Sequence, residues 1–123
     1  MNDASHGNPT GPLARTPQPP YFAVVFTSVR KPTEAAEYAA MADRMVELAA
    51  EQPGFLGVES ARDHSGAGIT VSYWASLEAI RDWRAHAEHR VAQAQGRSTW
   101  YGEYRMRICR VERDVHFIAN ENA

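Results

Sequence analysis

The sequence predicts an α+β protein in which one antiparallel sheet packs against two helices. Segments rich in β-branched and aromatic residues alternate with two alanine-rich segments whose apolar residues recur at helical spacing. Glycine and proline residues separate these segments. The chain has 123 residues, 44% of them hydrophobic, which suffices for one hydrophobic core but not for two domains with separate cores.

The two ends of the chain differ from its middle in composition. Residues 1–20 include Pro9, Pro12, Pro17, Pro19 and Pro20 and almost no large apolar side chains. Such a segment buries too little surface to offset the entropy lost on ordering it. We therefore expect a flexible N-terminal arm over residues 1–20, a folded domain over residues 21–118 and a loose C-terminal tail over residues 119–123.

The folded part is expected to open with a strand and a helix. Residues 21–29 are mostly aromatic and β-branched, which is typical of a strand. A helix is predicted from Thr33 to about Glu51, because Tyr38, Met41 and Met45 recur at helical spacing. The segment 52–54 then ends the helix with proline and glycine.

A hairpin and a second helix follow. Strands are predicted over residues 55–62 and 69–75, joined by the polar and glycine-rich turn 63–68. Ser76 is a suitable N-cap for the next helix. Its helical pattern weakens near His86 and resumes from Val91 to about Ser98, which suggests a separate short helix there.

A long last strand is predicted from Tyr104 to Phe117. Its apolar phase shifts between Met106 and Cys109, which indicates either a bulge or burial on both faces. The element order is therefore β-α-β-β-α-β, the ferredoxin-like pattern with a four-stranded antiparallel sheet.

This topology predicts a homodimer. Two helices cover only one face of a four-stranded sheet, yet the first strand carries Phe22 and Val24 on one face and Ala23 and Val25 on the other. Monomers rarely expose so large an apolar surface. A second copy that packs sheet against sheet would cover it by a symmetric contact.

The residues that could carry chemistry concentrate between Tyr73 and Tyr104. This stretch holds all three tryptophans, and His89, Gln93 and Arg97 are spaced four apart, so a continuous helix would place them on one face. Two interpretations are open: a solvated helix face with the tryptophans in the core, or a polar row beside an aromatic binding wall. The candidate site residues are His86, His89, Tyr73, Trp74, Trp83, Gln93, Arg97 and Trp100.

Other site classes find less support. Asp82, His86 and His89 could offer a carboxylate and two imidazoles to a metal, but such sites usually gather ligands from more than one element, so we predict no metal. The formal net charge of -2, with acidic residues among the arginines of the last strand, argues against a nucleic-acid partner. The sequence contains no apolar run long enough to cross a membrane, no signal-peptide pattern and a single cysteine, so we expect a cytoplasmic protein without disulfides.

Several segments, in order and spacing, resemble the antibiotic biosynthesis monooxygenase family. They are residues 52–57 (QPGFLG), 72–80 (SYWASLEAI), 83–86 (WRAH), 89–93 (HRVAQ), Gly96 with Arg97, and Trp100 with Tyr101. The likeness covers about residues 21–117 and is more specific for the fold than for the reaction. It implies a dimeric α+β barrel and, for some members, oxidation of phenolic intermediates with O2 and no cofactor.

Relatives with this fold that open haem use a strand-one asparagine, a helix-two tryptophan and an axial histidine. Trp83 matches the tryptophan, but residues 21–29 contain no asparagine, and Gln93 aligns with the axial position, one turn from His89. These departures weaken the haem interpretation.

The sequence thus leads to the hypothesis of a cofactor-independent monooxygenase that acts on a small aromatic or quinol-like molecule. His89 is the first choice of base and His86 the second. Tyr73, Trp74 and Trp83 would form the binding wall, and Gln93 and Arg97 would stabilise developing negative charge. Trp100 is a further candidate for substrate binding. The alternatives are a haem-binding or haem-degrading relative, and a non-catalytic dimeric protein that binds a ligand.

Overall fold

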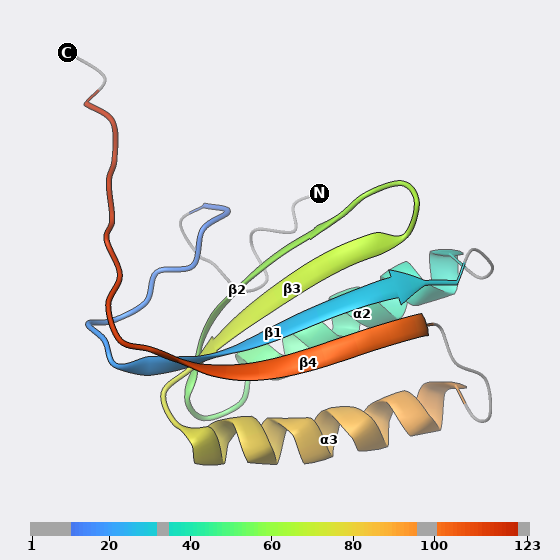
Figure 1. Cartoon of the computed structure of the whole chain (residues 1–123). Helices are drawn as coiled ribbons and strands as arrows, with labels where there is room; N and C mark the ends of the chain where they lie inside the picture. The colour runs from blue at the N-terminus through green and yellow to red at the C-terminus, as the bar shows by residue number, and fades with distance from the viewer. Residues whose placement is uncertain (1–10, 32–34, 96–100, 121–123) are drawn as a thin grey trace.

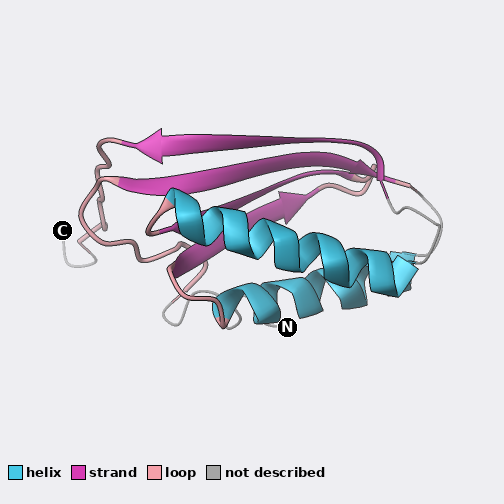
Figure 2. Ribbon diagram, turned by 90° about the horizontal axis from the view of Figure 1, so that it is seen from below, coloured by secondary structure: helices cyan, strands magenta, loops and turns pink. Residues whose placement is uncertain are grey.

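The fold is a four-stranded antiparallel sheet with two helices on one face, as the sequence predicts (Figures 1 and 2). The computed structural model describes residues 11–31, 35–95 and 101–120, without the side chains of residues 35–38 and 91–95. The elements, in chain order, are β1 (Tyr21–Arg30), α2 (Ala35–Ala50), β2 (Phe55–Arg62), β3 (Ala67–Trp74), α3 (Leu77–Gln95) and β4 (Tyr101–Val111). The strand order β2-β3-β1-β4 places β1 in the interior and β4 at an edge.

The hydrophobic core lies between the helices and the sheet. Val24, Ala49, Trp74 and Ile80 form its buried centre, with one residue from each of β1, α2, β3 and α3. Antiparallel pairing sets Phe22 opposite Trp74, so both side chains point to the helices. The face opposite the helices, which we call the open face, carries the alternate residues of every strand. The two-residue period of the strands therefore fixes which side chains meet the helices.

Two expectations about continuity were wrong. α3 runs without a break from Leu77 to Gln95 and includes His86, where the sequence pattern suggested an interruption. The helical spacing of apolar residues is lost near His86 because polar residues stand there. Residues 77–95 contain no glycine or proline, however, so the helix itself continues. The short helix expected over residues 91–98 is, as far as Gln95, the last turn of α3, and residues 96–98 lie outside the described part.

The last strand also differs from its prediction. β4 spans Tyr101–Val111 rather than Tyr104–Phe117, and residues 112–120 continue without strand pairing. Its register against β1 is regular from Val111 to Glu103, with an irregularity only at Val29 and Arg30. The strand therefore has no bulge between Met106 and Cys109. It is not buried on both faces either, because residues 102–110 are exposed in the single chain.

The described part of the N-terminal arm, residues 11–20, lies against the open face. The backbone N–H of Ala14 donates to Glu59 Oε2 at 3.0 Å, and the Thr16 hydroxyl donates to the Tyr21 hydroxyl at 3.0 Å. Tyr21, which also packs edge to face on Tyr73, is only 4% exposed. Whether the arm as a whole is flexible stays a prediction. Among the helices that the structure describes, neither has the length and hydropathy of a membrane span.

Candidate functional site

An uncovered apolar surface lies on the helix side of β4. Ile108 pairs with Val24 and Met106 pairs with Phe26, and directly paired residues share a face of the sheet. Since Val24 belongs to the core beneath the helices, Ile108 and Met106 point to the same side. They remain 44% and 36% exposed. We call this surface the helix-side patch; it consists of Phe26, Tyr104, Met106 and Ile108.

Contacts between aromatic rings hold the side chains at one end of this patch in place. The ring of Phe26 lies 5.4 Å from Tyr101 and 5.3 Å from Tyr104, between ring centroids. The two tyrosine rings meet edge to face at 5.9 Å. Tyr104 is nevertheless 60% exposed. The patch therefore offers ordered aromatic surface to a ligand from the helix side of the sheet.

A stack of three rings lies on the same side of the sheet. Trp74 at the end of β3 is fully buried, and its indole N–H donates to Ser72 Oγ at 2.9 Å. Trp83 of α3 stacks on it with ring centroids 6.1 Å apart and planes 23° apart. His86, one turn further along α3, lies 5.7 Å from Trp83 at 31°. The stack connects the core to a titratable imidazole.

The two candidate bases have different surroundings. The Nε2 atom of His86 is buried and has no hydrogen-bond partner among the residues that the structure describes. His89, three residues later, is exposed. Three residues along an α-helix fall about 60° short of a full turn, so the side chains of His86 and His89 point in different directions. This difference places His86 at the edge of the buried face and His89 in solvent. His86 therefore carries a free acceptor or donor atom away from bulk water, and His89 does not.

Tyr73 lies apart from the other predicted wall residues. It pairs with Ala23 on the open face, so the sheet separates it from Trp74 and Trp83. Its hydroxyl donates to Glu59 Oε1 at 2.8 Å. Burial, and then this hydrogen bond to the carboxylate, raise the pKa of Tyr73 well above its ordinary value. The structure thus gives Tyr73 a role on the open face and does not bring it to the helix-side patch.

The remaining predicted residues cannot be placed in full. Gln93 belongs to α3, but the structure does not describe its side chain. Arg97 and Trp100 lie outside the described residues.

The sequence analysis also missed the contribution of Tyr104, Met106 and Ile108. The sequence does show that apolar residues alternate along β4. Only the pairing of β4 with β1 shows on which face of the sheet these apolar side chains lie.

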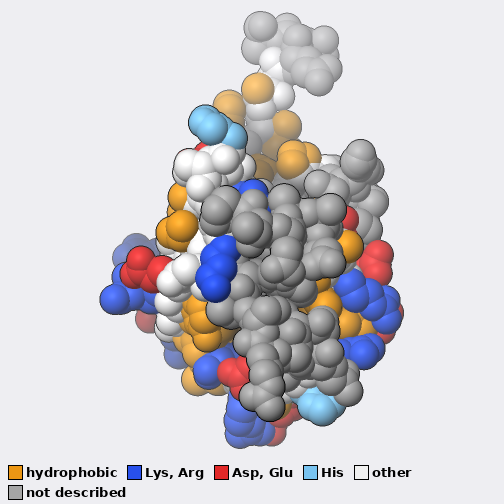
Figure 3. Space-filling model, turned by 90° about the vertical axis from the view of Figure 1, so that its right-hand side faces the viewer, with side chains coloured by type: hydrophobic (Ala, Val, Ile, Leu, Met, Phe, Trp, Pro, Cys, Tyr) orange, Lys and Arg blue, Asp and Glu red, His pale blue; other side chains and the backbone are white. Residues whose placement is uncertain are grey.

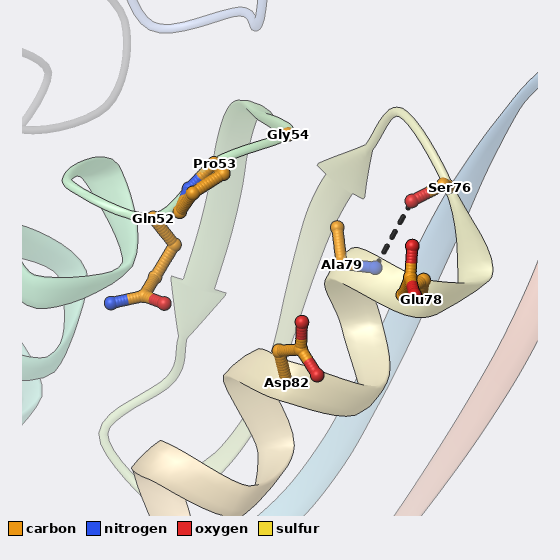
Figure 4. Close-up of a pocket in the computed structure, with 7 residues that line it drawn as sticks. All are labelled: Gln52, Pro53, Gly54, Ser76, Glu78, Ala79 and Asp82. Carbon is orange, nitrogen blue, oxygen red and sulfur yellow. Dashed lines mark hydrogen bonds between the residues drawn. The ribbon is translucent and has the colours of Figure 1, made fainter.

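A small cavity of about 230 Å³ lies elsewhere, at the start of α3. Ser76 caps this helix by accepting a hydrogen bond from the Ala79 N–H at 3.0 Å, beside the carboxylates of Glu78 and Asp82 (Figure 4). The loop 52–54 forms its other wall. This cavity does not include the ring stack.

Within the described ranges, no three histidine, cysteine or acidic side chains come close enough to share a metal ion, and His89 and Asp82 are both exposed.

Comparison with known proteins gives one family and several relatives. The model of the family named antibiotic biosynthesis monooxygenase matches residues 20–95. The protein YqjZ of Bacillus subtilis is 53% identical over 110 residues, which cover 89% of this chain and 96% of YqjZ. Jasmonate monooxygenase ABM of Pyricularia oryzae is 27% identical over 96 residues, 76% of this chain and 45% of that enzyme.

Solved structures agree on the fold. SnoaB, a cofactor-independent oxygenase from Streptomyces nogalater, superimposes with a TM-score of 0.64 over 77% of this chain and 96% of its own, at 14% sequence identity. The protein SO0527 of Shewanella oneidensis gives a TM-score of 0.64 over 83% of this chain and all of its own, at 10% identity. At these identities the similarity concerns the fold alone.

Proposed function

This chain belongs to the antibiotic biosynthesis monooxygenase family, and on that premise we propose that it oxidises a small aromatic or quinol-like molecule with O2 and without a cofactor. The observation that carries the proposal is the stack of Trp74, Trp83 and His86 on the side of the sheet that holds the helix-side patch. It combines an apolar surface with a buried imidazole nitrogen that no group in the described part of the chain hydrogen-bonds.

Substrate binding would use apolar side chains of β4 and of α3. A flat ring that rests on Met106 and Ile108 removes their exposed surface from water, and Trp83 offers a second aromatic face. The site supplies few polar groups apart from His86 among the described residues, so it favours substrates with a large apolar ring system and one ionisable position.

The proposed chemistry begins with proton removal. Nε2 of His86 accepts a proton from an acidic O–H or ring C–H of the substrate, since no other group of the described part of the chain competes for this nitrogen. The resulting anion is electron-rich and transfers one electron to O2. The two radicals then combine to form a C–O bond, which gives a hydroperoxide.

The step balances without an external reductant. A ring CH2 becomes C=O when the hydroperoxide loses water, so one oxygen atom enters the product and the other leaves as water with the two hydrogens of the substrate. The substrate supplies all four electrons that O2 accepts. The protein has to bind, deprotonate and exclude water, which are functions that the observed side chains can perform.

Oxygen consumption tests the proposal. With an anthrone-type or quinol substrate, the purified protein is expected to consume O2 and to place one atom from ¹⁸O2 in the product. His86→Ala should lower kcat/KM by about a hundredfold or more, the usual range for loss of a general base. His89→Ala is the matched control, because His89 is exposed on the same helix, and its activity should stay close to that of the wild type.

Three outcomes would contradict the proposal. If neither substrate class supports O2 consumption although a ligand co-purifies with the protein, the chain is a binding protein. Loss of activity in His89→Ala but not in His86→Ala would assign the base to the exposed histidine. A saturable Soret shift at equimolar haem, coupled to haem loss, would instead favour the haem-degrading alternative.

A further inference from the structure

The apolar surface of the helix-side patch continues onto α3. Leu77, the first residue of this helix, is 55% exposed, and Ile108 and Met106 of the patch are 44% and 36% exposed. Figures 1 and 2 show α3 running along the β4 side of the sheet. Figure 3, seen from the end where β1 ends, shows hydrophobic side chains next to lysine and arginine side chains at the surface. Neighbouring exposed apolar side chains of this kind indicate a binding surface.

The rotation of α3 turns Leu77 toward β4. A Cβ atom at Gly54, which precedes β2, would lie 2.7 Å from the Cβ of Ala79, so Ala79 faces the β2 side. Ile80 is 1% exposed and faces the sheet. Successive helical residues are turned by about 100°, so the direction passes from β2 to the sheet between Ala79 and Ile80. Leu77 lies about 60° further in the same sense, toward β4 at the opposite edge of the sheet.

Two arginines border this surface, one from each element. Arg84 follows Leu77 by nearly two full turns and therefore lies on the same side of α3. Its side chain is 44% exposed. Arg110 pairs with Phe22, whose side chain points to the helices, so Arg110 lies beside Ile108 on the helix side of β4. Its side chain is 57% exposed. Cationic groups therefore stand on both sides of an apolar surface.

The present partners of these arginines hold them weakly. Arg84 Nη2 lies 4.0 Å from Glu88 Oε2, and Arg110 Nε lies 3.7 Å from Glu112 Oε2. Both glutamate side chains are 74% exposed. Long ion pairs in solvent contribute little to stability, whereas a guanidinium holds a carboxylate more tightly when both oxygens accept short hydrogen bonds. Both arginines can therefore exchange these contacts for the carboxylate of a ligand.

We propose that this surface binds an amphipathic monocarboxylate. Arg84 and Arg110 recognise its carboxylate, and its apolar body lies on Leu77, Ile108 and Met106. The inference rests on the proposed function in one respect, because it assigns a carboxylate to the substrate of the helix-side patch. A ligand with a single charge is favoured over a polyanion, since an acidic residue stands beside each arginine.

Fluorescence titration in the absence of O2 tests the proposal with anthracene-2-carboxylate and with its neutral primary amide, which has the same ring system. The wild type should bind one carboxylate per chain with a Kd about tenfold or more below that of the amide. Arg84→Gln and Arg110→Gln should each raise the Kd of the carboxylate about tenfold and leave that of the amide within about twofold. Ile108→Ser should weaken the binding of both probes, because it removes apolar contact area that they share.

Arg81→Gln is the matched control. Arg81 belongs to the same helix, but its guanidinium pairs with Glu78 at 3.4 Å and with Asp82 at 3.7 Å. The variant removes the same positive charge, and its Kd for the carboxylate should stay within about twofold of the wild type. Equal affinity of the wild type for the two probes, or equal weakening by Arg81→Gln and Arg110→Gln, would overturn the proposal. Lack of saturable carboxylate binding up to about 1 mM would overturn it as well.

Two results separate this inference from the oxidation chemistry. Carboxylate binding with the expected responses, in a protein that consumes no O2, would leave the inference in place and contradict the proposed function alone. Consumption of O2 with neutral substrates only, unaffected by Arg84→Gln or Arg110→Gln, would overturn the inference and leave the proposed function in place.

Discussion

Adjacent residues at the end of β3 show how strand geometry assigns roles to side chains. Trp74 is fully buried beneath the helices, whereas Tyr73 reaches Glu59 on the open face. Both are large aromatic residues, and composition alone placed them together in one binding wall. The two-residue period of the strand separates them, because consecutive side chains point to opposite faces.

The ionisation of Tyr73 gives a residue-scale prediction. Burial and the hydrogen bond to Glu59 raise its pKa in the folded protein above that of the unfolded chain. A raised folded-state pKa contributes stability that is complete below about pH 10 and is lost as the pH rises through the folded value, since the unfolded chain then releases the proton first.

Alkaline titration measures this shift. The absorbance change at 295 nm should contain a late step that becomes smaller in Tyr73→Phe, because the pKa of Tyr21 is raised as well. The free energy of unfolding of the wild type should fall above pH 10 more steeply than that of the variant. Tyr104→Phe is the control, because Tyr104 is exposed and far from Glu59 in the sheet, and it should leave the late step of Tyr73 unchanged. A wild-type titration without this late step would contradict the prediction.

At the scale of elements, the turn before β2 sets the position of α3. Gly54 has a φ of +87°, and a Cβ atom there would lie 2.7 Å from the Cβ of Ala79 in the first turn of α3. The turn also receives the Ala75 N–H, which donates to the Gly54 carbonyl at 2.8 Å. Backbone conformation and close approach both require glycine at this point.

Gly54→Ala is therefore expected to destabilise the protein by about 1–3 kcal/mol, from the left-handed backbone and the displacement of α3. Urea denaturation measures the loss. Gly102→Ala is the matched control. A Cβ atom at Gly102 would lie 3.9 Å from the Val29 carbonyl oxygen, which is an ordinary contact distance. Equal stability of the two variants would show that α3 does not depend on this approach.

At the scale of the whole molecule, the described parts of the N-terminal arm and of the segment after β4 meet at one end of the sheet. Thr16 of the arm and Asp114 of the tail bond to the same Tyr21 hydroxyl. By contrast, β4 is exposed on both faces from Gly102 to Arg110. The described part of the chain therefore has one well-covered end of the sheet and one exposed edge strand.

Removal of residues 1–19 tests the contribution of the arm. The variant loses the hydrogen bonds of Ala14 and Thr16 and exposes Tyr21, so its Tm should fall while its circular dichroism spectrum keeps the same helix and strand content. Removal of residues 1–10 keeps both bonds and should leave the Tm unchanged. If both truncated proteins melt together with the wild type, the arm does not stabilise the domain.

The sequence by itself determined the element order, the ferredoxin-like fold and the family, because local periodicity, turn residues and helix caps are encoded over short stretches of chain. It also identified Trp74, Trp83 and His86 as candidate residues. It misplaced the end of the last strand, since residues 112–118 alternate like a strand but have no neighbour with which to pair in one chain.

Only the tertiary structure decided which candidates share a face. The β1–β4 register brought Met106 and Ile108 to the helix side, and the rotation of α3 buried the Nε2 of His86 while leaving His89 exposed. Such relations depend on contacts between residues far apart in the chain. Local sequence patterns do not encode them, because one strand or helix alone does not specify what covers each of its sides.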